Sequence, residues 1–270
     1  MESLRVLITV KTYPIPSKSH DELVCTAGVT EDGRWIRLYP INFRDLPFSQ
    51  QYKKYQWITV SAERHTGRDS RKESYRPDCT SLVLGDEIET KRGDWSQRAR
   101  YVLQHPAKSM EDLWDQKDVD RTSLGVFKPA EVFDLEVSDD DREWKDSFLQ
   151  ELRQARLFEN RGVSMEPPRK VPFKFHYRFR CDDSRCKANH RMQIEDWEVG
   201  ALFWRLVDEG RTEAQAAEAV KQKFLTELCG PGKDTWFFVG TILAHGTWVV
   251  IGVFYPKSDP ATAEGSLFAS

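Results

Sequence analysis

Twenty residues, from 171 to 190, constrain the fold of this chain more than any other stretch. Apolar or aromatic side chains alternate there with basic ones, and the segment then runs into two cysteines and a histidine. Successive side chains of a β-strand point to opposite faces, so the pattern predicts a strand with one aromatic and one basic face. We expect the aromatic face to lie in the core. The aromatic face would consist of Val171, Phe173, Phe175, Tyr177 and Phe179, and the basic face of Lys174, His176, Arg178 and Arg180.

Cys181, Cys186 and His190 have the spacing of metal ligands, with four residues between the cysteines and three before the histidine. Two thiolates and one imidazole suit zinc, so we expect a structural zinc site. The sequence does not identify the fourth ligand. His176 is near in sequence but unsuitable, because it would lie about 16 Å from Cys181 along an extended strand and on the other face. If three protein ligands and a water held the metal, it could be catalytic. The alternative without a metal is two ordinary buried cysteines beside a surface histidine. The open candidates are Glu195, Asp196, Cys229, His245, Cys25 and Cys79.

The basic strand also suggests a nucleic-acid partner. Between residues 166 and 191 eight Lys or Arg face three Asp or Glu, although the whole chain has a formal net charge of -3. Such a local patch can neutralise backbone phosphates, and the alternative is a solvated sheet face. DNA and RNA remain equally open as partners. We expect phosphate contacts from Lys174, Arg178 and Arg180, aided by Arg68, Arg71 and Lys72 of a charged loop, and base stacking by Tyr13, Trp35, Tyr39 and Trp57.

The first ~90 residues contain several short strand-like runs separated by turn signals, including Glu31-Asp32-Gly33. This spacing predicts a partly open β-barrel resembling an OB-fold. The fold class we expect is α+β and β-dominated. Residues 1–162 would form the barrel-like unit with helical additions. Residues 166–258 would form a smaller β-unit with the Cys/His knuckle and a pair of helices, and residues 259–270 a frayed tail.

A metal-dependent nuclease is the alternative from a different functional class. The nuclease pattern is Pro-Asp followed by Glu-x-Lys. The chain matches it loosely with Asp78 and, after ten intervening residues, Glu89 and Lys91. In that chemistry two carboxylates hold Mg²⁺ and the lysine helps to activate water. A third hypothesis is a non-enzymatic interaction module within a larger bacterial assembly. The leading hypothesis is a nucleic-acid-binding protein without catalytic residues.

Composition sets outer limits on these hypotheses. Five cysteines are an odd number, so a complete disulfide framework is not expected. We see no signal peptide, and no apolar run reaches the ~20 residues needed to span a bilayer. The sequence therefore predicts a soluble cytoplasmic protein that has no membrane partner.

Several phrases of the sequence resemble a family of uncharacterised prokaryotic proteins with a dual OB-fold domain. The resemblance implies two small β-barrel-like units and, by analogy, nucleic-acid handling, but it assigns no catalytic residue. It spans most of the chain. The phrases are Lys11-Thr-Tyr-Pro14, Cys25-Thr-Ala-Gly28, Trp35-Ile-Arg-Leu-Tyr-Pro40, Gly125-Val-Phe-Lys-Pro129, Cys181 through Glu198, and Phe237-Phe-Val-Gly240.

Overall fold

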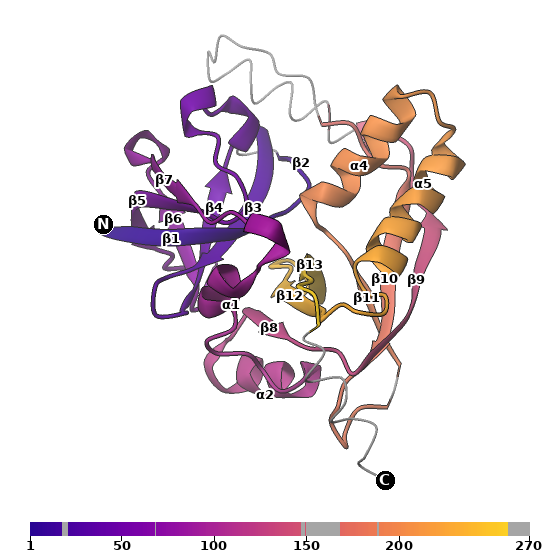
Figure 1. Cartoon of the computed structure of the whole chain (residues 1–270). Coiled ribbons are helices and arrows are strands. Elements are labelled where there is room, and N and C mark those ends of the chain that lie inside the picture. Colours follow the sequence, from indigo (N-terminus) through magenta and orange to yellow (C-terminus); the bar gives the residue numbers. More distant parts are fainter. Residues whose placement is uncertain (18–20, 68, 147–148, 150–167, 188, 259–270) are drawn as a thin grey trace.

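The computed structural model shows a β-dominated α+β protein (Figure 1). It describes the chain apart from residues 18–20, 68, 147–148, 150–167, 188 and 259–270. A barrel built by the first strands lies on one side of the molecule, and β9, β10, α4 and α5 lie on the other, with β12 and β13 between them (Figure 1).

Five strands of the first 77 residues close into a barrel. Going around it, β1 pairs with β3, β3 with β4, β4 with β6, β6 with β5, and β5 again with β1. The β4–β6 pairing is parallel and the others are antiparallel. This closed arrangement is consistent with an OB-like unit. The barrel strands are β1 (Glu2–Lys11), β3 (Asp21–Val29), β4 (Trp35–Ile41), β5 (Gln56–Arg64) and β6 (Ser74–Pro77).

Local sequence explains why the barrel strands turn where they do. The predicted hairpin between β3 and β4 is confirmed, and Gly33 at its tip has φ of 77°, which favours glycine. Inward-facing Val6, Ile8 and Val60 are fully buried in the barrel core. Two short strands, β2 (Ile15–Ser17) and β7 (Val83–Glu87), extend the sheet beside β3 and β5.

The described residues after the barrel contain two further sheets, each of three strands. In one, β12 (Trp236–Thr241) lies between β8 (Leu124–Phe127) and β13 (Trp248–Phe254). In the other, β10 (Phe173–Arg180) lies between β9 (Glu131–Asp139) and β11 (His190–Gln193). The predicted strand around residues 171–180 is therefore β10, and its aromatic face is core: Phe175, Tyr177 and Phe179 are buried.

Strands from before and after the predicted boundary between the two units pair with each other. The segment between the predicted units, residues 162–166, lies outside the described residues. β8 and β9, which precede it, pair with β12 and β10, which follow it. The two later sheets are thus each assembled from both sides of that segment.

Four helices of the described residues accompany the sheets. α1 (Ser96–Val102) and α2 (Met110–Asp120) follow the barrel, and α4 (Trp197–Asp208) and α5 (Glu213–Lys221) form the predicted pair. Thr212 and Gln215 form a capping box at the start of α5, and a π-helical segment (Gln222–Glu227) continues α5. Short 3-10 turns occupy Phe43–Asp45, Phe48–Gln50, Cys79–Ser81 and Lys91–Gly93. Within the described part of the chain, no helix is both long and apolar enough to cross a bilayer.

Polar side chains join the barrel to the rest of the chain. Lys54 pairs with both carboxylate oxygens of Asp196, each at 2.8 Å, and Asp196 also caps the start of α4. Arg37 of β4, which is 1% exposed, donates to Ser123 Oγ at 2.7 Å and to the Ser123 carbonyl at 3.0 Å. The Arg37 contacts are buried and the Lys54 contact is partly buried, so the barrel and the rest of the described chain pack against each other.

Candidate metal centre and cationic surfaces

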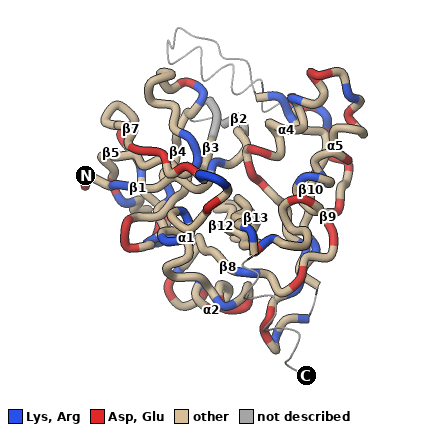
Figure 2. Tube along the Cα trace, in the orientation of Figure 1, with Lys and Arg blue, Asp and Glu red and all other residues tan. Residues whose placement is uncertain are grey.

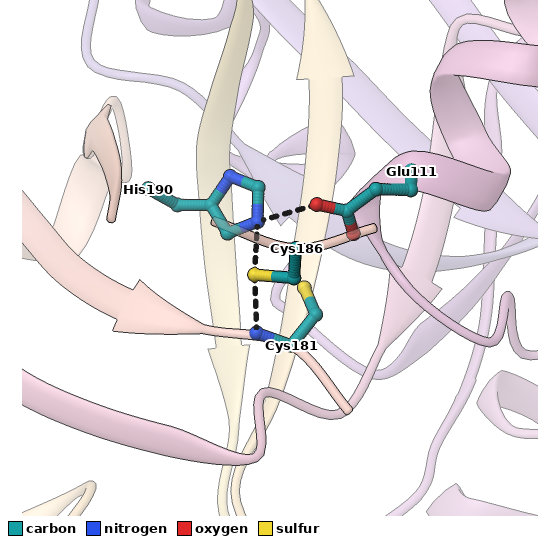
Figure 3. A group of neighbouring side chains, drawn as sticks. All are labelled: Glu111, Cys181, Cys186 and His190. Carbon is teal, nitrogen blue, oxygen red and sulfur yellow. Dashed lines mark hydrogen bonds and ion pairs between the residues drawn. The ribbon is translucent and has the colours of Figure 1, made fainter. Parts of the chain in front are cut away.

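Four side chains converge beside the first turn of α2 (Figure 3). They are Glu111, Cys181, Cys186 and His190, and one ligand atom from each lies within 4.8 Å of all the others. His190 Nε2 is 3.0 Å from Glu111 Oε1 and 3.2 Å from Cys186 Sγ. A tetrahedron with metal–ligand bonds of ~2.0–2.3 Å has edges of roughly 3.3–3.8 Å, so the spacing suits one ion.

Neighbouring contacts hold these four side chains in place. The backbone N–H of Met110 donates to Cys181 Sγ at 3.4 Å, and the N–H of Cys181 donates to Cys186 Sγ at 3.3 Å. Ser109, the N-cap of α2, accepts from the N–H of Asp112 and also donates to Asp183 of the knuckle at 2.7 Å. The knuckle is therefore anchored to the beginning of α2.

The ring of His190 is also fixed by packing. It stacks on Phe179 with ring centroids 4.9 Å apart, and Trp114 of α2 packs against it at 5.4 Å. A clamped imidazole loses little side-chain entropy on binding an ion. The sheet face that buries Phe179 thus also orients a ligand.

The donor set fits a metal ion. Glu111 is 6% exposed, and its Oε2 has no hydrogen-bond partner among the described residues. Burial raises the pKa of the Cys181 thiol to about 12, so without an ion this thiol stays protonated. A metal would bind it as the thiolate and release a proton. The Glu/Cys/Cys/His group could therefore hold a metal through four protein ligands.

Glu111 is a member of this group that sequence reasoning missed. It lies 70 residues before Cys181 (181 minus 111) and no metal-ligand spacing connects them. None of the six candidates named above for the fourth ligand belongs to the group of four. Asp196, for example, caps α4 and pairs with Lys54 instead. No local sequence signal could have found Glu111, because its contact with the group depends on how α2 folds against the knuckle.

The cations of β10 are each paired with an acidic side chain. Lys174 lies 3.0 Å from Asp140, Arg178 lies 3.5 Å from Glu136, and Arg180 lies 3.0 Å from Glu131. The acids belong to β9 or follow it directly, so the strand pairing brings them next to the cations of β10. Figure 2 shows both acidic and basic positions in this part of the molecule. The positive charge that is conspicuous along the sequence is largely balanced in three dimensions.

The charged loop between β5 and β6 is also engaged with the rest of the chain. Arg71 pairs with Asp69 at 2.6 Å and donates to the Thr241 carbonyl at 2.8 Å, whereas Lys72 pairs with Asp120 at 2.6 Å. Arg68 lies outside the described residues. The loop therefore fastens the barrel to β12 and α2.

A groove of about 880 Å³ separates the β4–β6 side of the barrel from the segment around α2. It is lined by Arg34, Arg64 and Lys72, and by the acids Asp32 and Glu73. Arg34 and Arg64 are exposed and form no ion pair with any residue that the structure describes. Since Glu73 accepts from the N–H and hydroxyl of Ser123, its charge is directed into the protein interior.

Of the four aromatic residues expected to stack on bases, three pack against the protein itself. Trp57 is 5% exposed, Trp35 packs on Phe238, and Tyr13 packs on Trp197 and donates to a backbone carbonyl. Tyr39 is half-buried and lines a cavity between the barrel and the β12–β13 hairpin.

The structure does not bring together the three residues of the nuclease hypothesis. The N–H of Asp78 bonds to Ser61 of β5, whereas Glu87, just before Glu89, lies opposite Gln56 at the other end of β5. Ser61 and Gln56 are about 16 Å apart along an extended strand. Asp78 instead accepts from Thr80 and caps a 3-10 turn.

Two sequence families match the chain. Residues 2–104 match a domain of unknown function (DUF8758), and residues 106–270 match another domain of unknown function (DUF8757). The junction at residues 104–106 lies between α1 and α2. Among curated proteins, no sequence matches this chain.

Proposed function

The chain belongs to the family described as domain of unknown function (DUF8757), and we propose that it is a nucleic-acid-binding protein stabilised by a structural zinc ion. The observation that carries this proposal is the groove beside β4 and β6, with Arg34, Arg64 and Lys72 along it. In an OB-like barrel the second and third strands and the loop between the last two strands are where oligonucleotides bind. β4 is the third barrel strand and Lys72 stands in that loop.

In this proposal the cations of the groove contribute more to phosphate binding than the cations of β10. Those of the groove include two exposed arginines that can neutralise phosphates directly. Those of β10 must first exchange the carboxylates of β9 for phosphates. Exposed ion pairs contribute only about 0–1 kcal/mol, so Lys174, Arg178 and Arg180 can serve as a secondary contact.

Zinc is the ion that the knuckle would hold. Two thiolates, an imidazole and a carboxylate match the soft and borderline ligands that zinc takes in proteins. Four protein ligands leave no open position for water, as in a structural site. In this role the ion fixes α2, which forms one wall of the groove, to the β10–β11 hairpin.

Fluorescence anisotropy with labelled single- and double-stranded DNA and RNA, at two salt concentrations, tests the binding. We expect affinity to fall steeply with salt, and the double variant Arg34→Glu/Arg64→Glu to weaken binding at least tenfold and to flatten the salt dependence by about one phosphate per charge removed. Arg178→Glu/Arg180→Glu should have a smaller effect.

The matched control reverses two exposed arginines elsewhere, Arg205→Glu/Arg211→Glu, and should leave binding unchanged. Equal affinity of the wild-type chain and both test variants would refute the proposal. Including Mg²⁺ in one series shows whether any substrate is cut, in which case Glu89→Ala tests the nuclease alternative. Absence of binding to every nucleic acid would favour the interaction-module hypothesis.

A further inference from the structure

A small pocket lies between the β10–β11 hairpin and the beginning of α4. Its volume is about 230 Å³, below the roughly 300–1,000 Å³ of sites that hold drug-sized ligands. The pocket therefore suits a ligand of about one ring. Aromatic and charged side chains both line it, and the aromatic ones are Tyr13, Trp144, Phe173 and Phe175.

The aromatic side chains of this pocket are held by other contacts. Trp144 donates its indole N–H to the Pro168 carbonyl at 2.7 Å, and Phe173 packs on Phe203 of α4 with ring centroids 5.8 Å apart. These contacts exist without a ligand, so the aromatic part of the pocket is pre-formed, as is usual for small-molecule sites.

Two lysines of the pocket share a single carboxylate. Lys170 Nζ lies 3.0 Å from one oxygen of Asp140, and Lys174 Nζ lies 3.0 Å from the other. A further acid at the pocket, Asp196, is already paired with Lys54. Two ammonium groups thus face one carboxylate, which leaves one positive charge in excess. The side chain of Lys174 is 42% exposed, so a ligand can reach its ammonium group from solvent.

Glu195 is the other acid of the pocket, and it has no cationic partner. Among the described residues it forms no ion pair, and its carboxyl accepts from one side chain, the amide of Gln193, at 2.6 Å. Burial raises the pKa of Glu195 to about 7, and Asp140 adds to this increase while Lys174 opposes it. A carboxyl group with such a pKa takes up a proton near neutral pH and can then donate a hydrogen bond.

The chemistry of these groups disfavours two simple kinds of ligand. An amine would pair with the carboxylate of Glu195 but would place a third ammonium group beside Lys170 and Lys174. An inorganic anion would neutralise the excess positive charge but would leave the aromatic side chains in contact with water. A carboxylate attached to an apolar ring meets both requirements, because its charge matches the lysines and its ring matches the aromatic side chains.

We propose that this pocket binds a small aromatic monocarboxylate. The ligand carboxylate would lie between the ammonium group of Lys174 and the protonated carboxyl of Glu195, and its ring would lie against Phe173 and Trp144. Two carboxyl groups in such a site cannot both be ionised, so the ligand binds the protein in which Glu195 carries a proton. The inference goes beyond the proposed function, since no nucleic acid takes part in it.

Isothermal titration of the full-length protein with benzoate at pH 6 and pH 8 tests this inference. With a pKa of about 7, roughly nine-tenths of the Glu195 carboxyls are protonated at pH 6 and roughly one-tenth at pH 8. Benzoate, which is ionised at both pH values, should therefore bind about tenfold more tightly at pH 6. Benzamide has the ring without the charge, and inorganic phosphate has the charge without the ring, so each should bind about tenfold more weakly than benzoate or worse.

Variants assign the two polar contacts. Glu195→Gln retains a hydrogen-bond donor but cannot titrate, so it should bind benzoate equally at both pH values. Lys174→Met should weaken binding at pH 6 about tenfold or more, whereas Lys108→Met, at an exposed lysine outside the pocket, is the matched control and should bind like the wild type.

The outcomes are separate from those that test the proposed function. Glu195→Gln leaves the cations of the groove in place, so it should bind oligonucleotides like the wild type. The inference would be overturned if a folded wild-type chain did not bind benzoate at pH 6 or bound it equally at pH 6 and pH 8. Equal binding of benzamide, or displacement of benzoate by inorganic phosphate, would overturn it as well.

Discussion

Two buried side chains, Glu111 and Arg37, each have an atom without a hydrogen-bond partner among the described residues, but the two atoms are of opposite kinds. Oε2 of Glu111 is an electron-pair donor that lies beside two sulfur atoms and an imidazole. Nε of Arg37 is a proton donor enclosed by protein atoms where the barrel contacts Ser123. Completing the first requires a cation, and completing the second requires a hydrogen-bond acceptor. The first atom therefore belongs to a candidate metal site, whereas the second belongs to a buried polar contact between two parts of the protein.

The two regions also differ in what their polar groups stabilise. The Glu111 group connects α2 to the β10–β11 hairpin, outside the barrel. The Arg37 group connects the barrel to β8 and β12, because Arg37 reaches Ser123 and Arg71 reaches Thr241. Loss of the first should loosen one part of the protein, and loss of the second should loosen the contact between its parts.

The largest effect should come from removing the metal. Without it, four electron-pair donors lie within 4.8 Å of one another in a buried place. We expect one zinc ion per purified chain by elemental analysis, and a loss of about 3 kcal/mol or more on chelation. That corresponds to a fall in Tm of roughly 6–12 °C for a chain of this size.

Cysteine variants give the control for this prediction. Cys186→Ser should lose the zinc, whereas Cys79→Ser, at a half-buried cysteine outside the group, should retain it. A metal-free wild-type chain whose Tm does not respond to added zinc would contradict the metal site. The unpaired Oε2 of Glu111 would then not indicate a cation.

A somewhat smaller effect is expected at Arg37. Arg37→Met fills similar volume but removes two hydrogen bonds to Ser123 and the positive charge near buried Glu73. We expect a loss of about 2–4 kcal/mol in the free energy of unfolding, measured by urea denaturation. Arg34→Met, three residues earlier and exposed, should change it by less than about 0.5 kcal/mol. Equal stability of the two variants would mean that the Arg37 contacts do not join the two halves.

The smallest effect concerns Glu195, a buried carboxyl that accepts from Gln193. Its pKa is about 7 in the folded protein and about 4.3 in an unfolded chain. Between these values the unfolded chain ionises more readily, so stability should fall as pH rises from about 4.3 to 7. Glu195→Gln removes this loss and should be more stable than wild type above pH 7, by on the order of 1–2 kcal/mol.

Chemical denaturation at pH 5 and pH 8 measures this difference. Glu209→Gln, a glutamate with 58% of its side chain exposed, is the matched control and should follow the wild type at both pH values. If Glu195→Gln gained nothing at pH 8, the carboxyl of Glu195 would be better hydrated than its burial indicates.

The parts of the fold that depend on local patterns were predictable. The alternation of aromatic and basic residues gave the position of β10, and the Asp-Gly turn gave the β3–β4 hairpin. The capping residues Ser109 and Thr212 marked the beginnings of α2 and α5. These signals lie within a few residues of the structures they specify, so a single sequence contains them.

The site depended on contacts that no local pattern encodes. Glu111 joins the Cys/His group only because α2 folds against the knuckle. In the sequence, nothing distinguishes Arg37 from the other arginines of predicted strands. Conversely, the positive charge of β10 is visible in the sequence, but the acidic residues that balance it are not. Their positions depend on the register with β9, in which Arg180 lies opposite Glu131. The phosphate-binding role of β10 and the zinc ion remain predictions.

The pairing of β8 has a consequence for how this protein is made. All four residues of β8 are buried, and its sheet partner β12 begins at Trp236, 109 residues after β8 ends at Phe127. At about 5–20 residues per second, a ribosome needs roughly 5–20 s to supply that partner. During this time an apolar strand with an unpaired edge leaves the exit tunnel beside a barrel that can already close. We expect nascent chains stalled between these two points to recruit chaperones, and chains released after β12 to be free of them.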